Sequence, residues 1–178
     1  MKIERDLKRI EALAVTREDE NWEFRRYLKQ LDIDLDDLDD LVRRLTADVS
    51  AQIDCTQCAN CCKLISPILD QADVVEFAAG LRATDPEASP ATWQEIYLRP
   101  VEGGGPDRYQ FKALPCPFLE ADRCSNYAAR PTECRDYPYL HKDGFRSRLW
   151  GVVSNYALCP IVFNVYERLK AEFGFRMK

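Results

Sequence analysis

The sequence contains a single histidine, His141, and no long run of apolar residues. Because a membrane-spanning helix needs about 20 consecutive apolar residues, we expect no segment to cross a membrane. The N-terminus alternates charged with apolar residues, so it lacks the continuous apolar stretch of a secretory signal. The chain contains no G-x-G-x-x-G fingerprint, P-loop, G-x-S-x-G elbow or H-E-x-x-H motif, so its motifs give no support to a hydrolase or a kinase.

Cysteine is the unusual residue type among those present. Eight cysteines in 178 residues are too few for a small disulfide-stapled scaffold, and the 46% of hydrophobic residues can form one sizeable core. We therefore expect a single domain over residues 1–178, located in the cytoplasm. In that reducing compartment the thiols are metal ligands or redox groups rather than disulfides.

Charge is distributed unevenly along the chain. Residues 1–107 hold 13 Lys/Arg against 23 Asp/Glu, whereas residues 108–178 hold 12 against 7. Nonspecific nucleic-acid binding requires a concentrated basic surface, so we expect no nucleic-acid partner. We interpret the acidic half as the solvated surface of helices, with an acidic docking site for a basic partner as the alternative.

Most of the predicted elements are helices. Helical periodicity or a start signal predicts helices near 3–14, 20–31, 34–49, 70–81, 89–97 and 160–173. A strand is expected at 109–113, a hairpin or tight loop at 116–124 and a second strand at 145–153. The predicted fold class is therefore mainly α with a small β component (α+β), in which a helical framework surrounds a cysteine-rich metal-binding core.

Three regions are distinguished within this single predicted domain. Residues 1–54 form an N-terminal helical region, residues 55–162 carry the cysteines, and residues 163–178 are the remainder of the C-terminal helix. The glycine-rich segment 103–105 lies between groups of cysteines. If these cysteines share a site, this segment is a loop within one domain rather than a linker.

Four cysteines lie within eight residues: Cys55, Cys58, Cys61 and Cys62. Gaps of two residues let a turning backbone direct successive sulfurs toward a common centre, as thiolate metal sites require. Adjacent Cys61 and Cys62 point in different directions in most backbone conformations. This run therefore predicts either two neighbouring metal sites or a polynuclear one.

Four more cysteines are scattered through the second half: Cys116, Cys124, Cys134 and Cys159. All eight are candidate metal ligands, because eight thiols can complete two four-cysteine sites. In the alternative, fewer cysteines form one site and the rest are small buried hydrophobic residues.

Arg123, Arg130 and Arg135 lie near cysteines in the sequence and are candidates to hydrogen-bond the sulfurs or offset their charge. The neighbours of His141 indicate an exposed turn, so we expect this histidine at the surface.

Several cysteine motifs occur in the order found in a known family. They are Cys55 to Cys62, Cys116-Pro-Phe-Leu119, Cys124, the segment from Arg130 to Pro138, and Cys159. Over roughly residues 50–162 the chain resembles the YkgJ-type cysteine cluster family. This resemblance implies a zinc- or iron-chelating domain. The cysteine segments alone are also similar to flagellin lysine N-methylases, which implies an iron–sulfur cluster and leaves open whether the protein is an enzyme.

The residues favour an iron–sulfur cluster over zinc. Many zinc sites use separated C-x2-C pairs or mix cysteine with histidine, and here one histidine is present and no glycine lies between Cys55 and Cys62. The C-x2-C-x2-C spacing, with Cys-Pro pairs at Cys116 and Cys159, is similar to that of ferredoxins.

Three functions are compatible with the sequence. The first is a metal-binding protein for metal handling or electron transfer. The second is an iron–sulfur-dependent protein-modifying enzyme similar to the lysine N-methylases. The third is a structural zinc protein whose N-terminal helices bind a protein partner.

Overall fold

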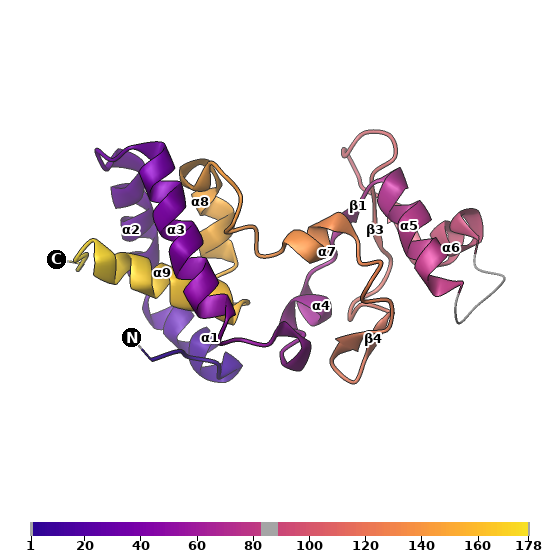
Figure 1. Cartoon of the computed structure of the whole chain (residues 1–178), viewed down its shortest axis with the longest axis horizontal. Helices are drawn as coiled ribbons and strands as arrows, with labels where there is room; N and C mark the ends of the chain where they lie inside the picture. Colours follow the sequence, from indigo (N-terminus) through magenta and orange to yellow (C-terminus); the bar gives the residue numbers. More distant parts are fainter. Residues whose placement is uncertain (1, 83–88, 178) are drawn as a thin grey trace. The chain divides into compact units, whose positions relative to one another are not determined.

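The computed structural model describes residues 2–82 and 89–177, which form two compact units (Figure 1). Unit 1 combines Met1–Asp54 with Pro138–Lys178, and unit 2 is the intervening segment Cys55–Tyr137. Helices predominate over short antiparallel strands, which confirms the predicted fold class. That the two units fold together as a single domain stays a prediction.

Unit 1 is helical throughout its regular structure. Its elements are α1 (Leu7–Thr16), α2 (Glu18–Gln30), α3 (Leu35–Ser50), α8 (Phe145–Ser154) and α9 (Pro160–Glu172). Helix α9 packs against α1 and α3, and α2 packs against α8. The N-cap of α3 is Asp34, whose carboxylate accepts hydrogen bonds from two backbone amides of the first turn. The predicted N-terminal helices and the last helix are confirmed.

The buried residues of α9 show why it lies at the centre of this unit. Val162, Val165, Tyr166 and Leu169 are all buried, as the predicted apolar stripe requires. Asn164, on another face of the helix, is also buried, and its side-chain amide donates to the carbonyl of Glu4 at 2.7 Å. The helix is therefore covered by other parts of unit 1 on more than one face.

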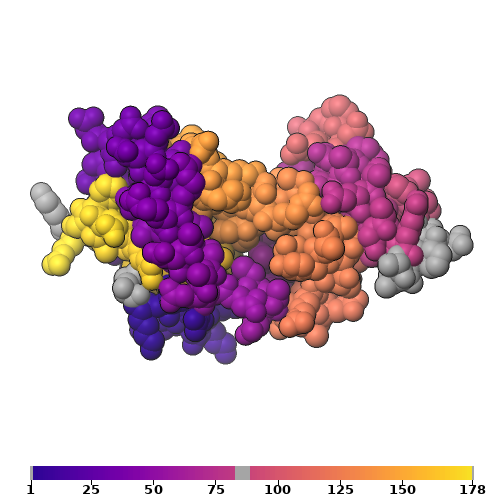
Figure 2. Space-filling model, viewed as in Figure 1, coloured from indigo at the N-terminus to yellow at the C-terminus, as the bar shows by residue number. Residues whose placement is uncertain are grey.

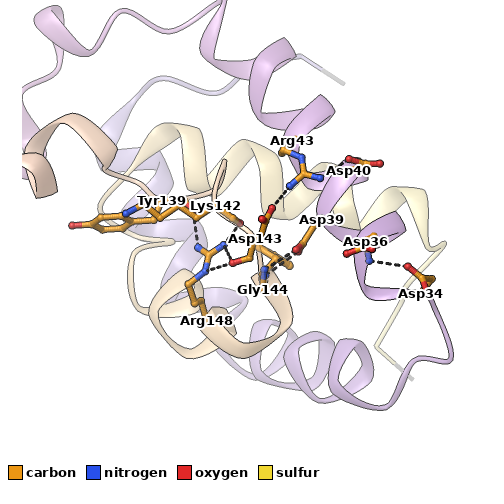
Figure 3. Close-up of polar contacts among 11 residues, drawn as sticks. Asp34, Asp36, Asp39, Asp40, Arg43, Tyr139, Lys142, Asp143, Gly144 and Arg148 are labelled. Carbon is orange, nitrogen blue, oxygen red and sulfur yellow. Dashed lines mark hydrogen bonds and ion pairs between the residues drawn. The ribbon is translucent and has the colours of Figure 1, made fainter.

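The predicted strand at 145–153 is wrong, because this segment forms helix α8. Its buried residues Phe145, Leu149 and Val152 recur at helical spacing rather than on alternate positions. The helix starts after Gly144, which has a positive φ of 74°. The Asp39 carboxylate accepts the amides of Gly144 at 2.6 Å and Phe145 at 2.9 Å (Figure 3). A carboxylate from another helix thus caps α8, which the sequence around α8 does not reveal.

Unit 2 mixes short helices and strands. Its elements are η1 (Cys55–Gln57), α4 (Asn60–Leu64), β1 (Ile68–Leu69), α5 (Gln71–Leu81), α6 (Pro90–Tyr97), β2 (Leu98–Pro100), β3 (Tyr109–Phe111), β4 (Leu119–Glu120), β5 (Arg123–Cys124) and α7 (Thr132–Asp136). Asp70 and Ser89 are the N-caps of α5 and α6, at the starts of the helices predicted for 70–81 and 89–97.

Two small antiparallel sheets organise unit 2. The first has the strand order β1-β3-β2, with Ile68 opposite Gln110 and Leu98 opposite Phe111. The glycine-rich segment lies in the connection between β2 and β3. Residues 102–108 of that connection are exposed, and they lie on the surface of unit 2 (Figure 2). The second sheet is the predicted hairpin, β4 paired with β5, whose turn residues Ala121 and Asp122 both have positive φ.

The core of unit 2 is aromatic. Phe77, Trp93, Phe111 and Phe118 are buried together, and ring centroids of Phe77 and Phe118 lie 4.7 Å apart in an edge-to-face arrangement. Cys116 is partly buried against this cluster. The aromatic core therefore supports the loop that carries one of the candidate ligands.

Within the described ranges, no helix is both long enough and apolar enough to span a bilayer. This agrees with the short apolar runs of the sequence.

Candidate metal centre

The cysteine-rich run folds into two short turns. Cys55 begins η1, and its carbonyl accepts hydrogen bonds from the amides of Cys58 and Ala59. Ala59 then adopts a left-handed conformation with a φ of 48° and precedes α4, which carries Cys61 and Cys62. Non-glycine residues rarely adopt this conformation, yet here Ala59 supplies a tight turn in a run that contains no glycine.

A backbone hydrogen bond joins this run to the second cysteine segment. The amide of Cys116 donates to the carbonyl of Cys62 at 2.8 Å. Strand β5, which contains Cys124, contacts η1, where Cys55 lies. Two cysteine segments far apart in sequence are therefore adjacent in unit 2.

Backbone amides also approach two of the sulfurs directly. The Cys116 thiol accepts the amide of Phe118, and the Cys124 thiol accepts the amide of Asn126. In both cases the donor lies two residues after the cysteine. Because a hydrogen bond to a sulfur favours its charged form, each amide offsets part of the effect of burial, which raises the pKa of both thiols.

The thiols of unit 2 influence one another electrostatically. Burial raises the pKa of Cys116 to about 11 and that of Cys134 to about 12, and the nearby Cys62 thiol adds to both effects. Burial likewise raises the pKa of Cys124, with Cys62 contributing. In contrast, a hydrogen bond from the Cys61 thiol lowers the pKa of Cys62 to about 7. Cys62 therefore raises the pKa of all three cysteines of the second half that lie in unit 2, Cys116, Cys124 and Cys134.

In the described part of the chain, none of the eight cysteines is joined in a disulfide. Among residues 2–82 and 89–177, no three His, Cys, Asp or Glu side chains are arranged as a group that could hold a metal ion. Unit 2 therefore brings Cys62, Cys116, Cys124 and Cys134 within electrostatic range without directing their sulfurs at one point. The chemistry of this donor set, thiols with amide donors and nearby cations, fits zinc or iron.

Two cations lie close to these thiols. The Arg130 guanidinium stacks 3.5 Å from the centroid of the Tyr127 ring and acts electrostatically on Cys62, Cys124 and Cys134. The Lys63 ammonium pairs with Asp122 at 2.6 Å, which raises the pKa of Lys63, and the Cys58 and Cys62 thiols add to this effect. Lys63 in turn helps to lower the pKa of Cys62. Lys63 was not predicted from the sequence, although it directly follows Cys62.

The other sequence-predicted residues have different surroundings. Arg135 pairs with Glu76 at 3.1 Å, and Arg123 is exposed on β5. His141 is exposed, as predicted. Cys159 belongs to unit 1, where it is the N-cap of α9 and only 6% exposed. Its role as a metal ligand stays a prediction.

Comparison with known proteins gives one family. No curated protein and no solved structure matches the chain. The family model named CxxCxxCC, described as a putative zinc- or iron-chelating domain, matches residues 54–151. The matched segment contains the seven cysteines of unit 2 and ends before Cys159. The chain therefore belongs to the CxxCxxCC family.

Proposed function

We propose that unit 2 binds an iron–sulfur cluster, or in the alternative zinc, through its cysteines, and serves metal handling or electron transfer. The observation that carries the proposal is the hydrogen bond between Cys116 and Cys62, which joins the two cysteine segments. The candidate ligands in unit 2 are Cys55, Cys58, Cys61, Cys62, Cys116, Cys124 and Cys134. Cys159 is an eighth predicted ligand.

The surroundings of the thiols support a charged thiolate site. Four thiolates leave a net charge of about −2 around either Zn²⁺ or a 2+ iron–sulfur core, so nearby donors and cations are needed. The amides of Phe118 and Asn126 are the donors at two sulfurs, and Arg130 and Lys63 are the cations. When bound, the metal centre would supply a reversible one-electron carrier if it is iron–sulfur, or a structural crosslink if it is zinc.

Metal analysis after anaerobic purification tests this proposal. We expect iron and inorganic sulfide in comparable amounts, together with visible absorption that is partly bleached by a reductant and lost on chelation of the iron. A colourless protein with stoichiometric zinc would contradict both the iron–sulfur proposal and the related modifying-enzyme alternative. It would support the structural zinc alternative instead. A folded, metal-free protein whose cysteines pair as disulfides would overturn every form of the proposal.

A further inference from the structure

Cys134 lies on a helix that is too short to hold its own position. Helix α7 has five residues, and Pro131 at its N-cap offers no side-chain hydrogen bond to the first turn. Isolated helices of this length are unstable in water, because nucleation costs more than a few hydrogen bonds return. The position of the Cys134 sulfur therefore depends on contacts between α7 and other elements of unit 2.

Asp73 on helix α5 makes the central contact. One oxygen of its carboxylate accepts both the backbone amide of Thr132, at 2.8 Å, and the Thr132 hydroxyl, at 2.9 Å. Asp73 is buried, with only 5% of its surface exposed. A buried carboxylate is tolerated only when hydrogen bonds replace its lost hydration, so this pairing strongly favours one placement of α7.

Both neighbours of Cys134 are also attached to the same framework. The Glu133 carboxylate accepts the amide of Ile68, on β1, at 2.7 Å. Arg135 donates to Glu76, on α5, at 3.1 Å. The residues on either side of the cysteine are thereby tied to β1 and α5.

We infer that Asp73 is a positioning residue that places Cys134 for metal binding, an inference that rests on the proposed function. Asp73 caps the first turn of α7 from another helix and so compensates for the missing cap at Pro131. Its carboxylate binds Thr132, two residues before Cys134. Its effect on the metal reaches Cys134 through Thr132 and the backbone of α7.

The test compares Asp73→Ala with Asp70→Ala in the full chain. Asp70 is the N-cap of the same helix, and its side chain accepts the amide of Asp73, within the first turn of α5, at 2.8 Å. The probes are Zn²⁺ and Cd²⁺, which bind thiolates and report through affinity and ultraviolet thiolate-to-metal absorption. We expect Asp73→Ala to weaken affinity at least about tenfold and to lower the absorption to the level of Cys134→Ser. Asp70→Ala should keep both signals.

A second readout separates positioning from general stability. Alkylation of the apo protein followed by mass spectrometry should show faster modification of Cys134 in Asp73→Ala than in Asp70→Ala. Where Asp73→Ala does not fold, Asp73→Asn replaces it, since its remaining carbonyl oxygen can still accept from Thr132 and should retain partial metal affinity. Equal affinity and equal alkylation in Asp73→Ala and Asp70→Ala would overturn the inference. A wild-type protein that binds neither metal, and that contains no iron and sulfide after anaerobic purification, would instead overturn the proposed function.

Discussion

The amide of Cys116 donates a 2.8 Å hydrogen bond to the carbonyl of Cys62. This contact brings the C-x-x-C-x-x-C-C run next to the loop that begins with Cys116 and Pro117. Because it joins backbone atoms, it persists when either side chain is replaced. Substitution of a single thiol can therefore test metal binding without removing the contact that organises the two segments.

Cys62→Ser should cause a large loss of metal from the purified protein. The Cys62 thiol acts electrostatically on those of Cys116, Cys124 and Cys134, so it holds the most connected position among them. Metal content per chain is the measurement, and far-ultraviolet circular dichroism confirms folding. Ser66→Ala, a substitution of another partly buried residue of unit 2, serves as the control and should retain metal. Unchanged metal content in Cys62→Ser would contradict the proposed ligand set.

Cys159→Ala should lower the stability of unit 1, because the side chain is 6% exposed at the start of α9. Loss of a small buried group costs about 1 kcal/mol, which chemical unfolding can measure. Val162→Ala, in the following turn of α9, removes a comparable buried group without removing a thiol. If Cys159→Ala loses metal while Val162→Ala retains it, the predicted ligand role is supported. Equal metal content in the two variants would contradict that role.

Asp39→Ala should destabilise unit 1 by about 1–2 kcal/mol. The carboxylate accepts the amides of Gly144 and Phe145 at the start of α8 (Figure 3), and its removal leaves them without that acceptor. Asp40→Ala is a matched control, since Asp40 is exposed and pairs with Arg43 at 2.5 Å. The control should cost no more than about 0.5 kcal/mol. Denaturant titration distinguishes the two, and equal losses would show that the cap contributes nothing specific.

The same substitution should have opposite effects at Gly80 and Gly151. A Cβ at Gly80 would lie 2.3 Å from Oδ1 of Asn126 and 2.6 Å from the Cβ of Ala129, whereas one at Gly151 meets nothing within 4 Å. We expect Gly80→Ala to destabilise by about 1–3 kcal/mol through overpacking. Gly151→Ala should stabilise its helix by about 0.5–1 kcal/mol.

Gly80→Ala also bears on the candidate metal site. Asn126 donates its side-chain amide to the carbonyl of Phe77 at 2.8 Å and its backbone amide to the Cys124 thiol. Displacement of Asn126 should therefore weaken metal binding, which titration with Zn²⁺ measures. Thermal unfolding of both glycine variants provides the stability comparison. A Gly80→Ala protein as stable as the wild type would show that Asn126 and Ala129 can move away from the added Cβ with little loss of stability.

Removal of the metal should loosen unit 2 more than unit 1. Metal binding adds its free energy to the part of the chain that supplies the ligands, because the unfolded chain lacks a formed site. Hydrogen exchange resolved by peptide, with and without a chelator, should show faster exchange in 55–137 than in the peptides of unit 1. Equal loss of protection in both units would instead support the prediction that they fold as a single domain.

The sequence alone determined the features that depend on neighbouring residues. Asp34, Asp70 and Ser89 mark helix starts because their side chains cap amides two or three residues later. The hairpin around Ala121 follows from local turn chemistry, and the spacing of the four clustered cysteines indicated thiolate chemistry. These signals were sufficient for the fold class and for the family.

Tertiary structure decided the features that depend on residues distant in the chain. Helix α8 was predicted as a strand although Phe145, Leu149 and Val152 recur at helical spacing, and the carboxylate that caps it belongs to Asp39, 105 residues before Gly144. Likewise, the dependence of α7 on Asp73 joins residues 59 positions apart. Such contacts leave no periodic signal in the sequence, since their energy arises only after folding has brought the partners together. The sequence therefore identified the thiols, whereas the tertiary structure decided which of them come within range of one another.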